Sequence, residues 1–248
     1  MIAFNKEQIY IVTGASSGIG RATALLLNNL GASVIAIARN KQRLESLKTD
    51  CKNPNNIYIE IKDLCENIND LPNYVKSLKE KYGKFFGMVY CAGVSELKPI
   101  AITEYEDMER DFNINYYAPI FMTKGLIDKR NNVGYGTSIV AISSIAAICS
   151  DKGHSIYSGA KAALCASMKV IANESVKNKI RVNCILPSII DTPMTNASEE
   201  EYLRSQLHLY PFGFGNPNDV AHMAIFLLSN KSAFISGQNY ILDSGGVR

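Results

Sequence analysis

Apolar residues in this chain follow two alternating patterns, short continuous runs and longer stretches with helical spacing. Short apolar runs are typical of strands buried on both faces, whereas apolar positions every three or four residues indicate amphipathic helices. The runs predict seven strands, at residues 8–13, 33–38, 57–61, 86–91, 138–143, 180–186 and 239–242. The helical stretches predict six helices, at residues 18–29, 41–51, 70–82, 104–129, 157–176 and 218–228.

Strands and helices that alternate from end to end require crossover connections between parallel strands. The pattern therefore predicts an α/β fold of the Rossmann type: a doubly wound, mainly parallel seven-stranded sheet with helices on both faces. No composition shift or low-complexity tract divides the chain, so we expect residues 1–248 to form a single domain.

Prolines mark irregular points in the helical pattern. Pro119 is expected to kink or interrupt the long helix at residues 104–129, because a proline removes a backbone donor and its ring clashes with the preceding turn. Asn216 followed by Pro217 predicts a helix start, with the asparagine as cap and the proline in the first turn.

One long irregular stretch, residues 187–215, precedes the last helix. Loops of this length in compact domains are usually functional, so we expect residues 188–215 to form a lid over a substrate rather than a linker. Within the lid, periodicity predicts a small amphipathic helix at residues 198–209. Its charged residues, including Glu199–Glu201 and Arg204, are expected to face solvent.

The composition changes this picture little. The 248 residues are 47% hydrophobic with a net charge of +3, and the cationic residues are scattered, which disfavours nucleic-acid or membrane binding. Six cysteines without a C-x-x-C pair predict reduced thiols, with neither a metal site nor a disulfide framework. No signal-peptide pattern and no apolar run of about 18 residues occur, so we expect a cytoplasmic protein.

The first predicted strand leads into Gly14-Ala-Ser-Ser-Gly18-Ile-Gly20, directly before a helix. Glycines at such a turn let the backbone approach a pyrophosphate, while the helix start offers amide donors and the positive end of its dipole. No Gly-Lys-Ser/Thr follows, which disfavours a nucleoside-triphosphate loop. The motif predicts a dinucleotide phosphate site, the alternative being a glycine turn without a ligand.

Dinucleotide folds often place an acidic residue about 20 residues further on, where it holds the ribose hydroxyls. Ala38 occupies that place here, and Arg39 follows it. A guanidinium suits a 2′-phosphate, which a carboxylate would repel. We therefore favour NADP(H) over NAD(H), the alternative being that Arg39 only caps a surface turn.

Tyr157 and Lys161 stand four residues apart in a predicted helix and so share one face. A tyrosine has an unperturbed pKa of roughly 10, and a nearby cation lowers that pKa toward the working range. The pair predicts proton transfer. By itself the spacing is weak, because many such pairs only decorate an amphipathic helix.

Taken together, several motifs resemble the shorter-chain branch of the short-chain dehydrogenase/reductase family, in the family's order and over nearly the whole chain. These motifs are Thr13-Gly-Ala-Ser-Ser-Gly-Ile-Gly20, Cys91-Ala-Gly93, Asn115, Ile142-Ser-Ser144, Tyr157-Ser-Gly-Ala-Lys161, Arg181-Val-Asn183 with Pro187 and Thr192, and Ser236-Gly-Gln238 with Asp243-Ser-Gly-Gly246.

The resemblance implies four catalytic residues. Tyr157 would exchange a proton with the substrate oxygen, and Ser144 would hydrogen-bond and orient that oxygen. Ser143 is the less suitable serine, because strand alternation sends the two side chains to opposite faces. Lys161 would lower the pKa of the tyrosine and bind the nicotinamide ribose. Asn115, rather than Asn113, would open its helix locally and hold a water in a proton relay to Lys161.

The resemblance also implies a cofactor surface. Asp63 would contact the adenine, the alternative being a turn residue at a strand end. The backbone of residues 91–93 would lie beside the adenosine ribose, and Pro187, Ile190 and Thr192 would flank the nicotinamide. The full expected set is Gly14, Ser16, Ser17, Gly18, Ile19, Gly20, Arg39, Asp63, Leu64, Cys91, Ala92, Gly93, Tyr157, Lys161, Pro187, Ile190 and Thr192.

Some positions depart from the family pattern. Cys91 replaces the usual asparagine and is expected to be a small buried filler, and Ser188 replaces a glycine that follows Pro187. Ser244 is an additional residue between Asp243 and Gly245. These departures bear on the pocket and on subunit contacts rather than on the four catalytic residues.

The expected function is an NADP(H)-dependent oxidoreductase that moves hydride between nicotinamide and a carbonyl or secondary alcohol carbon. Similarity points to 3-oxoacyl-carrier-protein reductases and to reductases of surface-polysaccharide pathways. The alternatives are a catalytically silent NADP(H)-sensing regulator and a sugar epimerase or dehydratase relative. A serine hydrolase using Ser144 and His154 is disfavoured, because no Gly-x-Ser-x-Gly elbow is present.

The family resemblance further implies a homo-oligomer, a tetramer or dimer. The fourth and fifth helices and the C-terminal segment would form its contacts. Apolar faces on residues 162–171 and 221–228 are compatible with that role.

Overall fold

The computed structural model describes residues 1–195, 203 and 205–246, and its centre is one sheet in which seven strands lie in the order β3-β2-β1-β4-β5-β6-β7. Each neighbouring pair is parallel. The strands are β1 Ile9–Thr13, β2 Ser33–Ala38, β3 Ile57–Ile61, β4 Phe85–Tyr90, β5 Ser138–Ile142, β6 Arg181–Pro187 and β7 Asn239–Leu242. The predicted doubly wound α/β fold is confirmed, and the sheet is wholly parallel.

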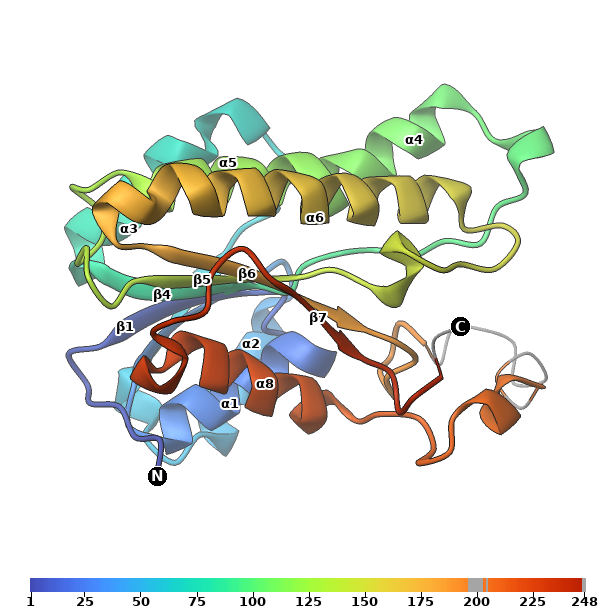
Figure 1. Ribbon diagram of the computed structural model, residues 1–248. Helices are drawn as coiled ribbons and strands as arrows, with labels where there is room; N and C mark the ends of the chain where they lie inside the picture. Colours follow the sequence, from blue (N-terminus) through green and yellow to red (C-terminus); the bar gives the residue numbers. More distant parts are fainter. Residues whose placement is uncertain (196–202, 204, 247–248) are drawn as a thin grey trace.

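Helices cover both faces of this sheet (Figure 1). Helices α1, α2 and α8 lie on one face, and α3, α4, α5 and α6 lie on the other. Their bounds are α1 Gly18–Asn29, α2 Lys41–Asp50, α3 Leu71–Tyr82, α4 Tyr105–Phe112, α5 Ala118–Ile127, α6 Ser155–Ser175 and α8 Pro217–Leu228. As expected, Asn216 caps α8 and Pro217 lies in its first turn.

Two apolar cores follow from this layering. Leu27, Leu44 and Val220 belong to the core under α1, α2 and α8. Val75, Met122 and Leu164 belong to the core under α3, α5 and α6. Every residue of β2 is buried, because its alternate side chains enter the two cores. This double burial explains why the strands appear in the sequence as continuous apolar runs.

The long helix expected at residues 104–129 is interrupted, but not by a proline kink. Helix α4 ends at Phe112, a π-helical turn spans Asn113–Tyr117, and α5 begins at Ala118. Pro119 lies in the first turn of α5, where its missing amide hydrogen is tolerated. The widened turn leaves the Ile114 carbonyl to accept a hydrogen bond from Tyr90 Oη at 3.1 Å.

The topology fixes where a ligand can bind. The chain passes from β3 at one edge of the sheet back to β4 beside β1, so the crossovers after β1 and β4 leave on opposite faces. In open α/β sheets, a crevice forms outside the carboxyl ends of the strands at such a switch point. In the described part of the chain, no helix combines the length and apolar character needed to span a membrane.

Candidate active site

Two adjoining cavities open at the carboxyl ends of the strands. One has a volume of about 730 Å³ and is bounded by the glycine-rich turn and the ends of β2 and β3. The other has a volume of about 420 Å³ and lies over β5 and the start of α6. They share the lining residues Ile19, Cys91, Gly93, Val94, Thr192 and Met194. The arrangement fits an extended molecule in the first cavity whose end reaches a smaller molecule in the second.

The glycine-rich turn is shaped by two close approaches. Gly14 has φ +65°, and a Cβ built on it would lie 2.9 Å from the Ala92 amide nitrogen. A Cβ on Gly20 would lie 2.4 Å from the Gly14 carbonyl oxygen. A larger residue at position 14 would therefore push the turn away from the end of β4, and one at position 20 would separate α1 from the turn. Helix α1 begins at Gly18 with no acidic residue in its first turn, so its amide end can attract a phosphate.

Cationic side chains surround the larger cavity. Arg39, which was expected there, lies with its Nη1 3.6 Å from Asp63 Oδ2, and its side chain is 75% exposed. Arg43, Lys62 and Arg110 also line the cavity and were missed. Arg43 lies in the first turn of α2, whereas Arg39 precedes the helix, so helical spacing carried no signal that joins the two. Among the described lining residues, Asp63 is the only carboxylate, and this donor set fits an anionic dinucleotide.

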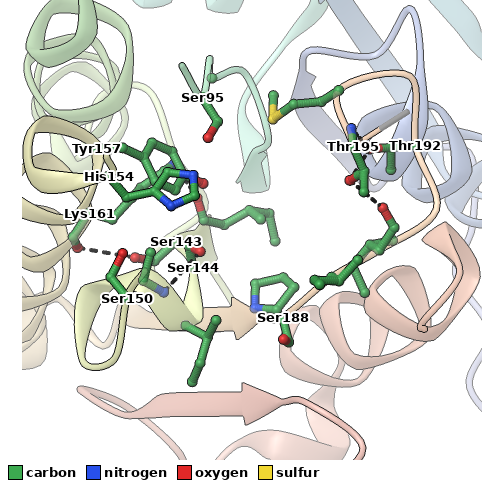
Figure 2. Close-up of a pocket in the computed structure, with 18 of the residues that line it drawn as sticks. Ser95, Ser143, Ser144, Ser150, His154, Tyr157, Lys161, Ser188, Thr192 and Thr195 are labelled. Carbon is green, nitrogen blue, oxygen red and sulfur yellow. Dashed lines mark hydrogen bonds between the residues drawn. The ribbon is translucent and has the colours of Figure 1, made fainter. Parts of the chain in front are cut away.

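Figure 2 shows how Tyr157 and Ser144 meet in the smaller cavity. Tyr157 lies in the first turns of α6, and Ser144 follows the end of β5 with an extended backbone. Both side chains line this cavity, and the Ser144 hydroxyl acts to lower the pKa of the Tyr157 phenol. Ser143 takes the other direction, as alternation predicted, and donates to the Lys161 carbonyl oxygen at 3.1 Å. Two hydroxyl groups therefore converge where a substrate oxygen could accept from both.

Lys161 lies behind the tyrosine, with only 4% of its surface exposed. Its Nζ donates to the Ile142 carbonyl oxygen at 3.0 Å and lies 5.7 Å from the centre of the Tyr157 ring. Burial lowers the pKa of Lys161 to about 8, because a charge is poorly solvated there.

The pKa of Tyr157 moves opposite to the sequence-based expectation. Burial raises it to about 12, against the lowering effect of the Ser144 hydroxyl. Desolvation therefore outweighs the stabilisation of phenolate that was expected from Lys161. The phenol of the protein alone is protonated at neutral pH, which suits the donation of a proton to a substrate oxygen.

Asn115 lies in the π-helical turn, fully buried beside Lys161. Its Nδ2 donates to the Val94 carbonyl oxygen and to Asp111 Oδ1, each at 2.9 Å, and its Oδ1 accepts from the Val94 amide at 3.3 Å. A Cβ on Gly93 would lie 2.7 Å from Asn115 Oδ1 and 3.5 Å from Lys161 Nζ. Asn115 and Lys161 thus approach the same side of Gly93.

Thr13, rather than the residue at position 91, ties the end of β4 to its neighbour. The Thr13 hydroxyl oxygen accepts from the amides of Cys91 at 3.0 Å and Ala92 at 3.1 Å. The Cys91 side chain lines both cavities, and burial raises the pKa of its thiol to about 12. Cys91 is therefore an inert thiol at the site, more exposed to ligands than the buried filler that was expected.

The departures in the expected lid make specific contacts. The Ser188 hydroxyl is 2.7 Å from the Tyr210 hydroxyl, and the Ser244 hydroxyl oxygen accepts from the Phe212 amide at 2.8 Å. Ser244 has φ +59°, which is uncommon for a residue other than glycine. Tyr210 therefore contacts the first residue of the segment at residues 188–215, and Phe212 contacts the turn that follows the edge strand β7.

Of the helix expected at residues 198–209, residues 198–202 and 204 lie outside the described residues, and these include Glu199–Glu201 and Arg204. The described Leu203, Ser205 and Gln206 are helical, and Leu207–Leu209 form a short 3₁₀ turn.

Every residue expected to contact the cofactor lines one of the two cavities. Thirteen of the set line the larger cavity, and Tyr157, Lys161, Pro187 and Ile190 line the smaller one. The sequence did not single out several polar residues of the smaller cavity, which include Ser95, Ser150, Thr195 and Tyr210. These residues lie in loops that carry no motif.

His154 lines the smaller cavity beside the tyrosine (Figure 2). The two ring centres are 6.0 Å apart, and burial lowers the pKa of the histidine. Ser144 Oγ accepts from the Ala146 amide at 3.1 Å, and no hydrogen bond joins it to His154 in the described part of the chain, so the geometry gives no support to a serine–histidine nucleophile.

Known proteins match this chain over almost its full length. A family model described as enoyl-(acyl carrier protein) reductase matches residues 14–246. A 3-oxoacyl-(acyl-carrier-protein) reductase from Thermotoga maritima is 31% identical over 244 residues, covering 96% of this chain and 97% of the relative. A D-erythrulose reductase from Gallus gallus is 33% identical over 238 residues, covering 95% and 94%.

Solved structures agree with this assignment. A short-chain type dehydrogenase/reductase from Mycobacterium ulcerans superposes with a TM-score of 0.90 at 31% identity, covering 99% of this chain and 91% of that one. A short-chain dehydrogenase/reductase from Brucella melitensis gives a TM-score of 0.92 at 25% identity, with all of both chains covered. With a hydroxyl pair, a buried lysine and a nucleotide-sized cavity on this fold, the chain belongs to the short-chain dehydrogenase/reductase family of oxidoreductases.

Proposed function

We propose that this protein is an NADP(H)-dependent reductase in which Tyr157 is the general acid that protonates a substrate carbonyl oxygen. The observation that carries the proposal is the convergence of Tyr157 and Ser144 in one cavity, which adjoins a cationic, nucleotide-sized one. The bound cofactor would supply the hydride to the carbonyl carbon.

The side chains have distinct jobs in this mechanism. Ser144 donates a hydrogen bond that polarises and orients the carbonyl oxygen, and Tyr157 gives its proton to that oxygen as negative charge develops. Lys161, held by the Ile142 carbonyl, places a positive charge behind the tyrosine and favours the phenolate that forms. Asn115 belongs to the route by which Tyr157 regains a proton.

NADP(H) is favoured over NAD(H) by the charges around the larger cavity. Arg39, Arg43 and Lys62 face the end of β2, where a carboxylate would bind ribose hydroxyls in an NAD(H) site. A 2′-phosphate would neutralise them, and a guanidinium binds phosphate in a bidentate way.

The substrate cavity combines hydroxyl groups with apolar side chains. Ser95, Ser150, Ser188, Thr195 and Tyr210 supply hydroxyls. Apolar contacts come from Val94, Leu97, Ile189 and Met194. Two substrate classes fit this lining, sugar ketones and 3-oxoacyl thioesters, and both occur among the substrates named for the relatives. The segment at residues 188–215 is the proposed lid over this cavity.

The protein is further proposed to act as a homo-oligomer. Met108 on α4, Tyr117 in the π-helical turn and Val170 on α6 are apolar and exposed. The other face that was expected at a subunit contact, residues 221–228, is mostly buried in the chain's own core.

The test is an NADPH-oxidation screen over sugar ketones, 3-oxoacyl thioesters and simple ketones, with Tyr157→Phe as the matched variant. The wild type is expected to oxidise NADPH with at least one class. The variant should bind NADPH with unchanged affinity. Its turnover should be slower by at least about 100-fold, because the proton donor is lost. Equal rates for the two proteins would rule out the proposed role of Tyr157.

A further inference from the structure

Asp111 is a buried carboxylate next to the proposed site that the mechanism above does not use. It lies on α4 with 6% of its surface exposed, four residues before Asn115. It lines neither cavity, so it contacts neither a substrate nor a cofactor bound there. A carboxylate away from water needs a compensating interaction, because burial of an unpaired charge is costly.

Its hydrogen bond fixes the side chain of Asn115. Asp111 Oδ1 accepts one Nδ2 hydrogen of Asn115 at 2.9 Å, and the Val94 carbonyl oxygen accepts the other at the same distance. The Val94 amide donates to Asn115 Oδ1. Rotating the amide by half a turn would place its oxygen against two acceptors, so Asp111 and Val94 together permit one orientation.

The charge of Asp111 also acts on Lys161. The titratable groups that act on the Lys161 ammonium are Asp111 from α4, Cys165 from α6, Cys184 from β6 and Cys91 after β4. Asp111 is the only carboxylate in that set and the strongest influence opposing the burial that lowers the pKa of Lys161. Burial raises the pKa of the Asp111 carboxyl group. The charges of Lys161, Arg110 and Glu96 also affect that pKa.

Arg110 is mainly engaged elsewhere. Its guanidinium is exposed at the surface and pairs with Glu96 at 2.5 Å and with Asp107 at 3.1 Å. Among the described residues around Asn115, two buried ionisable groups are the Asp111 carboxyl group, which bonds the Asn115 amide, and the Lys161 amine, which approaches the same side of Gly93 as that amide. At low local dielectric, each charge stabilises the other more than it would in water.

We propose that Asp111 is a positioning residue of the active site, which holds the Asn115 amide in one orientation and supplies the negative charge that keeps the buried Lys161 an ammonium. The role rests on the proposed function, because it acts through Lys161 and Asn115. The effect of its charge on Lys161 can be measured without turnover.

The test is Asp111→Asn, which removes the charge and leaves an oxygen that can still accept from Asn115. Protein labelled with ¹³C at lysine Cε reports the protonation of each lysine by NMR, and the Lys161 signal is the one absent from Lys161→Arg. In the wild type this signal is expected to titrate near pH 8. In Asp111→Asn it should titrate about one pH unit lower, because a nearby anion no longer stabilises the ammonium.

Asp107→Asn is the matched control, since it removes another buried carboxylate from the same helix, one that pairs with Lys98 and Arg110. It should leave the Lys161 titration unchanged while lowering the melting temperature. Asp111→Ser, which is smaller and also uncharged, repeats the measurement if Asp111→Asn does not fold.

An unchanged Lys161 titration in a folded Asp111 variant would overturn the proposal, whatever its melting temperature. Where turnover is measurable, the alkaline fall of kcat should shift downward with the titration in the Asp111 variant. The Kd for NADPH should stay within about twofold, because Asp111 touches neither cavity. A protein with no reductase activity but with the shifted titration would contradict the proposed function and leave the electrostatic role of Asp111 standing.

Discussion

At the scale of single residues, the site depends on the absence of a side chain at Gly93. Asn115 Oδ1 and Lys161 Nζ approach the point where a Cβ would stand, at 2.7 Å and 3.5 Å. The first distance is shorter than any normal contact, so a methyl group there must displace the Asn115 amide. Because that amide is held by Asp111 and Val94, the displacement would disturb the whole proton-transfer arrangement.

Gly93→Ala is therefore expected to lower kcat by about 100-fold, because misplacement of catalytic groups by about 1 Å has effects of that size. Steady-state kinetics with the best substrate would measure it. Gly159→Ala is the matched control: this glycine lies inside α6, and its added Cβ would meet only Phe112 at 3.9 Å. The control should keep its activity and raise the melting temperature by about 2 °C. Similar kcat values for the two variants would contradict the role given to Gly93.

The pH dependence of the reaction follows from two residues. Tyr157, with a pKa raised to about 12 by burial, stays protonated through the neutral range and can donate. Lys161, with a pKa lowered to about 8 by burial, loses its charge above that pH. The kcat for carbonyl reduction should be level below pH 8 and fall above it. Alcohol oxidation needs phenolate, so its kcat should rise with pH. A reduction rate that increases through pH 8 would show that Lys161 is not required as an ammonium.

How far single residues could be predicted depended on whether they belong to a local motif. Tyr157, Lys161 and the glycine-rich turn stand in short sequence patterns, and the structure brings them to the two cavities. Asp111 had no such pattern, and its hydrogen bond to Asn115 is visible only in the folded chain. The direction of the Tyr157 pKa shift was missed because burial is a property of the assembled site.

At the scale of elements, the end of β2 and the start of α2 line the part of the larger cavity that would distinguish NADP(H) from NAD(H) under the proposed function. Strand β2 ends at Ala38, Arg39 follows, and α2 begins at Lys41 with Arg43 in its first turn. The Asn40 side chain accepts from the Arg43 amide at 2.9 Å and so fixes the start of the helix. Both guanidinium groups are thereby carried by a capped helix start rather than by a free loop.

The double variant Arg39→Ala/Arg43→Ala should raise the Kd for NADPH by about tenfold or more, because a hydrogen bond to a charged group contributes about 1.5–3 kcal/mol. The Kd for NADH should change much less, since NADH lacks the 2′-phosphate. Fluorescence titration with each nucleotide measures the ratio of the Kd for NADH to the Kd for NADPH. An equal loss of affinity for NADPH and NADH would show that these arginines bind a part common to the two cofactors.

Most elements were predictable because their apolar patterns follow from burial in a two-faced sheet. Strands β2, β3 and β7 have the predicted bounds, and the others differ by one residue or two. The π-helical turn contains Asn115, where the family resemblance implied a local opening of the helix, whereas the proline had suggested a kink at residue 119. The widening at Asn113–Tyr117 instead accompanies long-range contacts, including the Tyr90 hydroxyl bond to the Ile114 carbonyl.

At the scale of the whole molecule, the exposed apolar residues of α4, the π-helical turn and α6 support the proposed oligomer. Val170→Glu should weaken the association, because a carboxylate at the contact would lose hydration. Tyr135→Glu is the control, as Tyr135 is 76% exposed in the loop before β5. Sedimentation velocity is expected to show an oligomer for the wild type and control and smaller species for Val170→Glu. A monomeric wild type would contradict the assembly.

The central claim is that hydride passes from the nicotinamide to a carbonyl carbon under proton donation by Tyr157. The most direct measurement uses NADPH carrying deuterium at the transferable C4 position, with the product analysed by mass spectrometry. The wild type should yield an alcohol with one deuterium on the former carbonyl carbon. Tyr157→Phe should bind the same NADPH but form almost no product. NADPH oxidation without deuterium in the product, or full transfer by Tyr157→Phe, would contradict the account.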